Sequence, residues 1–403
     1  MAAAVASAAC GGSTDSGSDP GPKISKKAVV LDSTKAALVP DSAAQANGTY
    51  TFNVSSTHPI VSPGDVIVGA EGGGYLRRVN TVQAAAGQLV LETSDASLTD
   101  IVTEGSVTDT ITLDLASQSP ALGTGGVQWG ALEVLGPDGK PLSVRRGGVS
   151  LNGTVLFENA STKVTLSAGN IEFSPKFVLD MHIKEAQVND LVVSATGNLT
   201  FDATLQVNAS APLASLQLEK TVFTLKRSFL FFIGAVPVAG VARLDFMGTL
   251  GLGMNGAVIA TTGLLSTQSV TVGAQYGRSS SPQWSPVWSA TSTFTPQPLT
   301  FSAPVTASAE AGGKVQLTLT LYGVLGPNMY AGAKGVFATT ADFAQGTLNT
   351  KCTAKVYAGL GLDFKVLSYA LAKLSATKDL YSHDFCNRSD PIPGATTIAL
   401  LSG

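Results

Sequence analysis

Apolar and polar residues alternate strictly over several long stretches of this chain. In one of them, the odd positions from Leu191 to Ala209 are apolar or small, and the even positions from Asn198 to Ser210 are polar. Successive side chains of a β-strand point to opposite faces, so the pattern predicts a half-buried strand. Ordinary strands have about 5–6 residues, and this one is much longer. We expect the rest of the chain to pair with it.

The stretch just before this strand alternates in the same way. Apolar side chains from Ile171 to Ile183 point to one face, and mostly polar ones point to the other. Because only a few residues separate this stretch from the 191–209 strand, we expect the two to form an antiparallel pair. Pro175 lies within it, and a proline in a strand favours a sheet edge or a bulge.

Alternation returns in the last third of the chain. Two stretches, 301–309 and 315–321, flank Ala311-Gly312-Gly313-Lys314, and these glycines predict a hairpin turn that joins them. A later alternating stretch begins at Cys352, and its phase points Cys352 inward. The segment 229–265 departs from the pattern, because it is apolar on both faces and then rich in glycine. It is either a strand buried on both sides or a hairpin that another backbone approaches closely.

The pattern predicts an all-β protein with a small N-terminal β domain and a larger antiparallel domain of long strands, arranged as a sandwich or a curled half-barrel. Short strands such as 49–54, separated by Gly- and Pro-containing turns, indicate the small domain, and a Gly-rich polar stretch indicates a linker after it. The expected segments are a signal remnant or tether at 1–26, the small domain at 27–116, the linker at 117–127, the large domain at 128–384 and a tail at 385–403.

The composition and charge of the chain argue against two classes of function. Charged residues make up 13% of the chain and the formal net charge is −3. Nucleic-acid binding and docking to anionic membranes both use basic clusters, and the longest basic runs here are pairs such as Lys26-Lys27. The abundance of Gly, Ser, Thr and Ala is typical of a secreted β protein, so we expect an extracellular or cell-surface location.

The three cysteines support that location. Cys352 and Cys386 lie in one terminal region, and we expect them to form a disulfide, which leaves Cys10 alone. The residues Ser7-Ala8-Ala9-Cys10-Gly11-Gly12 resemble the lipobox of bacterial lipoproteins. The resemblance implies that Cys10 becomes lipidated, with Gly11–Pro22 as a flexible tether, and that this anchor is the sole membrane contact. The alternative is that residues 1–26 are a plain flexible tail.

A second resemblance concerns the small domain. Pro63-Gly64-Asp65-Val66-Ile67-Val68-Gly69, followed by Gly74-Tyr75-Leu76-Arg77-Arg78-Val79, is similar to a module of large, mostly uncharacterised bacterial secreted proteins. The resemblance covers about 70 residues and implies no activity, cofactor or site residue. A hairpin turn before a strand also accounts for Pro63-Gly64-Asp65.

The sequence offers no familiar catalytic or metal-binding motif. None of the three histidines lies in a zinc-protease or esterase motif. His383-Asp384-Phe385-Cys386 contains metal-binding residue types, but a disulfide-anchored tail explains it better. We therefore expect no enzyme activity, no catalytic residues, no metal and no cofactor.

One aromatic cluster is a candidate binding site. Tyr276, Trp284 and Trp288 lie on or beside a polar loop. Exposed, these rings would stack on sugars or anchor a partner, whereas buried, they would cap the core. We favour the capping role.

The leading hypothesis is a non-enzymatic secreted or lipid-anchored surface protein with a structural or adhesive role. Long strands suit an assembly of several copies if a sheet edge is open. One alternative is an extracellular carrier, in which the strands curl around a lipid or another apolar ligand. The other is a carbohydrate-binding or carbohydrate-active protein that uses the tryptophan loop.

Overall fold

The fold is all-β, as the alternation predicts. Strands make up 74% of the computed structural model and helices 4%. The structure describes residues 21–85, 87–112, 119–123, 126–142, 149–150, 152–254, 258–280, 283–301, 307–342, 345–362 and 374–391.

The small N-terminal sheet has the strand order β2-β5-β6-β7-β4-β3. Its core contains Phe52, Tyr75 and Leu91, all nearly inaccessible to solvent. A helix and two single 3-10 turns connect the strands, and the second turn lies within the stretch 97–102, where a helical turn fits the sequence. The elements are β2 (Ala28–Val30), β3 (Ala36–Leu38), α1 (Ser42–Ala46), β4 (Thr49–Val54), β5 (Val66–Gly69), η1 (Glu71–Gly73), β6 (Tyr75–Ala85), β7 (Gln88–Asp95) and η2 (Leu98–Asp100).

The first large sheet, which we call sheet C, has the order β1-β8-β13-β14-β17-β18, and β11 and β12 also pair with β13. The two predicted alternating strands are its centre, where β13 and β14 form the expected antiparallel pair. The turn between them has positive φ at both Glu185 and Ala186. The strands are β1 (Lys23–Ile24), β8 (Val102–Thr112), β11 (Val149–Ser150), β12 (Thr154–Glu158), β13 (Thr162–Lys184), β14 (Gln187–Ala209), β17 (Val258–Gly277) and β18 (Trp284–Phe301).

The second large sheet, sheet D, has the order β22-β21-β20-β19-β16-β15-β10-β9, and all of its neighbours are antiparallel. Most of its strands are joined in sequence as long hairpins. They are β9 (Ala121–Leu122), β10 (Gln128–Leu135), β15 (Leu213–Ile233), β16 (Val236–Met254), β19 (Ala307–Leu321), β20 (Val324–Asp342), β21 (Thr347–Leu362) and β22 (Leu374–Pro391).

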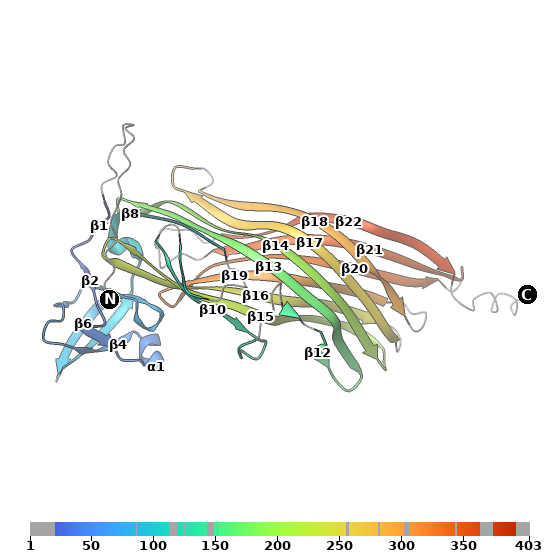
Figure 1. Cartoon of the computed structure of the whole chain (residues 1–403), viewed down its shortest axis with the longest axis horizontal. Helices are drawn as coiled ribbons and strands as arrows, with labels where there is room; N and C mark the ends of the chain where they lie inside the picture. Colours follow the sequence, from blue (N-terminus) through green and yellow to red (C-terminus); the bar gives the residue numbers. More distant parts are fainter. Residues whose placement is uncertain are drawn as a thin grey trace, which may run out of the picture.

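Sheets C and D face each other as an elongated sandwich, with the small domain at one end and the end of β22 at the other (Figure 1). A single apolar core joins Phe177 and Leu191 of sheet C to Phe246 and Leu317 of sheet D. Cα atoms of β17 and β20 come within 8 Å of each other. Stacked sheets usually lie about 10 Å apart, and the buried Ala331 and Ala333 of β20 are small enough for a closer approach.

The predicted hairpin turn at 311–314 is wrong. These residues lie inside β19, where Gly312 and Gly313 pair with Thr249 and Gly248 of β16 on one side and with β20 on the other. A Cβ on Gly312 would lie within 3 Å of the Ala333 carbonyl oxygen. The glycines serve close backbone packing here, which gives the same local sequence signal as a turn.

The strand pairing also differs from the predicted segment boundaries. β8, expected in the small domain, pairs with β13 of sheet C, and β1, expected in the tether, pairs with β8. β9 lies in the predicted linker and pairs with β10. β22 crosses the predicted start of the tail at residue 385. The large sheets therefore use strands from before and after the predicted large domain.

The segment that is apolar on both faces contains the β15–β16 hairpin. Residues 236–240, at the start of β16, are all buried. Val236 and Val238 belong to the sandwich core, while a Cβ on Gly74 of the small domain would touch Ala239. The Tyr322 hydroxyl donates to the Pro237 carbonyl at 2.6 Å. The start of β16 is thus buried on both sides, because the small domain covers its outer face.

Pro175 lies inside sheet C, at a break in the pairing of one edge of β13. Its neighbours pair with β11 at 170–171 and with β8 at 176–183. Within the described residues, no strand pairs with 172–175 on that side. On its other side, Pro175 pairs with Gly197 of β14.

Candidate functional site

The outer face of sheet C carries a regular array of uncharged polar side chains. Three cross-strand rows of three residues lie in register on β14, β17 and β18, and we call them the neutral array. All nine side chains are exposed or half-buried. The rows are Thr196–Thr271–Ser289, Asn198–Ser269–Thr291 and Thr200–Thr267–Thr293.

Sheet geometry sets the spacing of the neutral array. Neighbouring strands lie about 4.8 Å apart, and side chains on the same face repeat about every 6.7 Å along a strand. The hydroxyls of Thr196 and Thr271 lie 3.0 Å apart, within hydrogen-bond distance. The array therefore offers hydroxyl and amide groups at a fixed repeat, with no formal charge among its nine members.

The outer face of sheet D has a different chemistry. The Lys314 ammonium lies 2.6 Å from the Glu219 carboxylate and 5.3 Å from the ring centre of Tyr330. One strand further, Lys334 pairs with Glu310 at 2.9 Å and lies 5.7 Å from the ring centre of Tyr357. The two tyrosine rings meet edge to face, with their centres 6.3 Å apart. Ion pairs and aromatic contacts therefore link β15, β19, β20 and β21 on this face.

The pKa of the Tyr357 phenol is raised to about 12. Burial is the main cause, and the negative charges of Glu219 and Glu310 act in the same direction. The phenol consequently stays neutral and able to donate a hydrogen bond at any physiological pH. The Lys314 side chain in the same cluster is only 11% exposed. This cluster is therefore packed into the sheet surface, whereas most of the neutral array is open to solvent.

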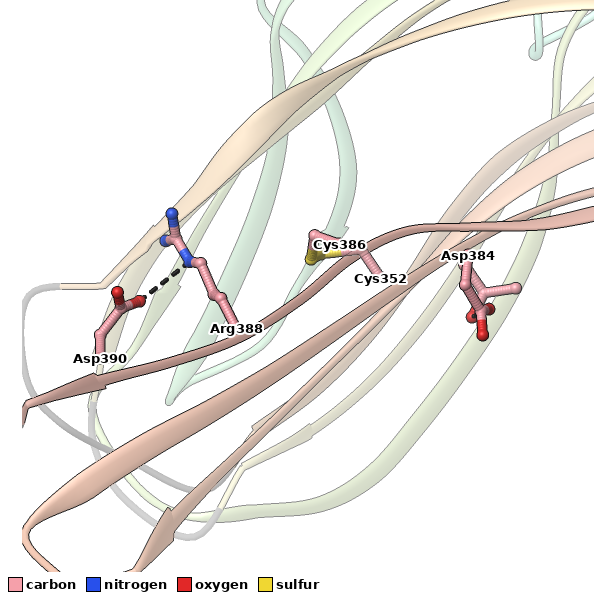
Figure 2. The surroundings of a disulfide bond; sticks show 6 residues. Cys352, Asp384, Cys386, Arg388 and Asp390 are labelled. Carbon is pink, nitrogen blue, oxygen red and sulfur yellow. Dashed lines mark hydrogen bonds and ion pairs between the residues drawn. A yellow bond between two sulfur atoms is a disulfide. The ribbon is translucent and has the colours of Figure 1, made fainter.

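Cys352 and Cys386 are joined in a disulfide, as expected from the sequence (Figure 2). They are directly opposite each other on β21 and β22, with their Cα atoms 4.9 Å apart. Beside them, Thr353 donates to Asp384 at 2.7 Å, and Arg388 pairs with Asp390 at 2.9 Å along β22. The bond ties the outermost strand of sheet D to its neighbour.

Both outer strands carry features that oppose pairing with another sheet. In β22, Phe385 and Leu380 are extra residues at two bulges, and charged side chains lie along the strand. In β18, Pro286, Pro296 and Pro298 lack a backbone N–H. Bulges, charges and prolines are the usual means by which proteins protect sheet edges. These edges thus do not favour the self-assembly considered from the sequence.

The predicted aromatic cluster belongs to the core where the structure describes it. Tyr276 and Trp284 are 6% and 7% exposed, and their rings lie 5.0 Å apart on paired strands. This burial fits the capping role and leaves neither ring free for a ligand. The side chain of Trp288 and the proposed lipidation site Cys10 lie outside what the structure describes.

A cavity of about 500 Å³ lies at the small-domain end of sheet C. Ser106, His182 and Asp190 line it, on β8, β13 and β14 respectively. Strand pairing places Ser106 directly opposite His182, and His182 directly opposite Asp190. Sequence motifs could not reveal this row, because its members come from three strands and have no characteristic local spacing.

A buried arginine binds the chain segment that connects sheet C to sheet D. Arg227 is 3% exposed; its Nε donates to the Gly130 carbonyl at 2.9 Å and its Nη2 to the Ser119 carbonyl at 2.8 Å. Burial lowers its pKa. Nearby, the Trp129 indole donates to the buried Asp109 at 3.3 Å. These bonds fix the segment through which the chain passes from sheet C to sheet D.

Comparisons of the chain with protein-family models, curated proteins and solved structures found no match. In the described part of the chain, no helix has the length and apolar character needed to cross a membrane. The same residues contain no group of three or more His, Cys, Asp or Glu side chains placed to hold a metal ion.

Proposed function

We propose that this protein is an extracellular surface protein with a structural and adhesive role, whose contact face is the neutral array. The array itself carries the proposal, because a registered set of uncharged hydroxyl and amide groups suits a neutral, hydroxyl-rich surface such as a polysaccharide. Contact confined to these nine residues removes no formal charge from water, and the exposed Lys176 and Glu172, which continue two of the rows on β13, stay outside it. Docking on the face of sheet D would desolvate several ions.

The shape of the molecule supports a spacer role. The 23 residues of β13 correspond to a length of about 75 Å at the usual rise per residue. β1 lies at the small-domain end of the sandwich, and β22 ends at the far end (Figure 1). A lipid on Cys10 would anchor the small-domain end and hold the neutral array away from the membrane.

The carrier hypothesis receives less support. A carrier needs space between its sheets, but β17 and β20 approach within 8 Å, and buried side chains of both sheets belong to one apolar cluster where the structure describes them. Carbohydrate binding remains part of the proposal, although through the neutral array and not through Tyr276 and Trp284, which are buried.

Retention of the full chain on particles of an insoluble neutral polysaccharide tests the adhesive role. Ser269→Lys places a long charged side chain in the centre of the neutral array and should abolish retention. Ser215→Lys makes the same change at an exposed position of sheet D and should leave retention unchanged. Equal retention of both variants would contradict the proposal.

The anchor has a separate test. In a bacterial host that processes lipoproteins, the chain should incorporate a labelled fatty acid and sediment with membranes, and Cys10→Ala should abolish both. Membrane association without the label would contradict the lipid anchor.

A further inference from the structure

The cavity at the small-domain end of sheet C contains the residue types of a hydrolytic site. Ser106 and His182 are directly opposite each other on β8 and β13. Directly opposed residues on one face have Cβ atoms about 4.5–5.5 Å apart, so ordinary rotamers bring a serine hydroxyl and an imidazole into hydrogen-bond reach. Both side chains line the cavity of about 500 Å³.

A carboxylate lies on the other side of the imidazole. The Nδ1 atom of His182 is 3.6 Å from an Asp180 carboxylate oxygen. The Thr108 hydroxyl donates to that carboxylate at 2.6 Å, which holds it in place. With Nδ1 facing Asp180, Nε2 is the ring nitrogen that a change of rotamer would bring to the Ser106 hydroxyl. This is the order of nucleophile, base and orienting carboxylate that serine hydrolases use.

The turn between β13 and β14 lies beside the row of Ser106 and His182 and is bonded to β8. Glu185 and Ala186, in the turn after β13, have φ values of 52° and 55°, which non-glycine residues adopt uncommonly. The Ala186 N–H donates to the Thr103 carbonyl at 2.9 Å and ties this turn to β8. Positive φ at both central residues is the geometry of a two-residue type I′ hairpin turn, and the bond to Thr103 fixes this turn against the strand that carries Ser106.

We propose that this row hydrolyses carboxylic esters, with Ser106 as nucleophile and His182 as general base. The Ser106 oxygen bonds to the ester carbonyl carbon while Nε2 of His182 takes the hydroxyl proton. The ester C–O bond then breaks, and the alcohol leaves with that proton. Water repeats the sequence on the acyl-serine and releases the acid. Asp180 acts through His182 and is a positioning residue.

The edge of β8 that faces away from β13 supplies candidate donors for the negative charge that develops on the carbonyl oxygen. β1 pairs with β8 only at Val102 and Glu104. Among the described residues, no strand pairs with β8 beyond that point on the side away from β13. Alternate N–H groups of an antiparallel strand point to each side, so backbone N–H groups of β8 near Ser106 are the candidate donors. The activity does not depend on the proposed adhesive role.

A fluorophosphonate probe tests the nucleophile in the full chain. The probe should label Ser106, identified by peptide mass analysis, and the chain should hydrolyse p-nitrophenyl acetate. Ser106→Ala should abolish labelling, and Ser106→Ala and His182→Gln should each lower hydrolysis by at least about 100-fold. Ser285→Ala, at an exposed serine of the same face that lies opposite Gln275 and outside the neutral array, should change neither measurement.

The positioning role of Asp180 has its own variants. Asp180→Asn should slow labelling and hydrolysis, and Asp180→Glu, which keeps the carboxylate, should restore most of the rate. Unchanged dichroism shows that the variants are folded. Absence of label on Ser106 in the unmodified chain, or full hydrolysis by Ser106→Ala, would overturn the proposal.

Discussion

The ring of Tyr330 on β20 lies directly over Gly359 on β21, so that a Cβ on this glycine would overlap the ring. The neighbouring pair repeats the arrangement in the opposite direction: a Cβ on Gly332 of β20 would lie 2.6 Å from the Tyr357 ring on β21. Each ring thus covers a glycine of the adjacent strand. Glycine weakens a strand by itself, and cross-strand aromatic packing compensates for that loss.

Gly359→Ala should destabilise the sandwich by about 1–3 kcal/mol, because the added methyl group displaces the Tyr330 ring. Gly361→Ala is the matched control in the same strand, since nothing lies within 4 Å of a Cβ there. It should change the free energy of unfolding by less than about 1 kcal/mol. Denaturant unfolding of both variants measures the difference, and equal stabilities would contradict the ring-over-glycine packing.

The disulfide should contribute about 3–4 kcal/mol through the chain entropy of its loop, which spans a sequence separation of 34. Mass analysis of the unreduced protein should find Cys352 and Cys386 linked. The double variant Cys352→Ser with Cys386→Ser should unfold at a lower denaturant concentration. Cys10→Ser leaves this bond intact and serves as the control. Two free thiols in the unreduced, mature protein would be incompatible with this prediction.

Arg227→Lys should destabilise the protein by about 2–3 kcal/mol, because one ammonium cannot replace the two guanidinium bonds to Gly130 and Ser119. The matched control is Lys226→Met, which breaks an exposed ion pair with Glu133 at 3.5 Å and should cost at most about 1 kcal/mol. Chemical denaturation compares the two variants. If the Arg227→Lys variant were as stable as the parent, a stabilising role for these two bonds would be refuted.

Stability should fall at alkaline pH as the buried tyrosines lose their protons. The folded-state pKa of Tyr357, about 12, exceeds the usual value of 10.0, so the unfolded chain releases this proton first. Its contribution is complete below pH 10 and is lost as the pH rises to about 12. Burial also raises the pKa values of Tyr75 and Tyr322, which act in the same direction.

Phenolate absorbance during alkaline titration checks this prediction. Tyr357→Phe should remove a titration step near pH 12, whereas Tyr381→Phe, at a 41% exposed tyrosine, should leave that step in place. A Tyr357→Phe titration identical to that of the parent would show that this phenol is not the group concerned.

Val193→Asp should unfold the large sandwich, because it buries a carboxylate at a position that is 1% exposed and belongs to the core. Asn198→Asp, on the opposite face of the same strand, should cost less than about 0.5 kcal/mol. Thermal melting separates the two. Similar melting temperatures for both variants would remove the basis for assigning the two faces of β14.

The sequence by itself determined the fold class and the faces of the long strands. Alternation between Leu191 and Ala209 was enough to predict β14, because side-chain direction in a strand depends only on position parity. The few residues that separate it from the stretch 171–183 predicted its antiparallel pairing with β13. The same rule pointed Cys352 inward, where it is 6% exposed and bonded to Cys386.

Tertiary structure decided what neighbouring strands bring together. Gly312 and Gly313 look like a turn in isolation, but they lie within β19 because adjacent backbones and side chains occupy the space that larger residues would need. Likewise, the row of Ser106 and His182 and the nine members of the neutral array arise from strand register. Register depends on hydrogen bonds and packing between segments distant in the chain, and no local pattern of residues contains that information.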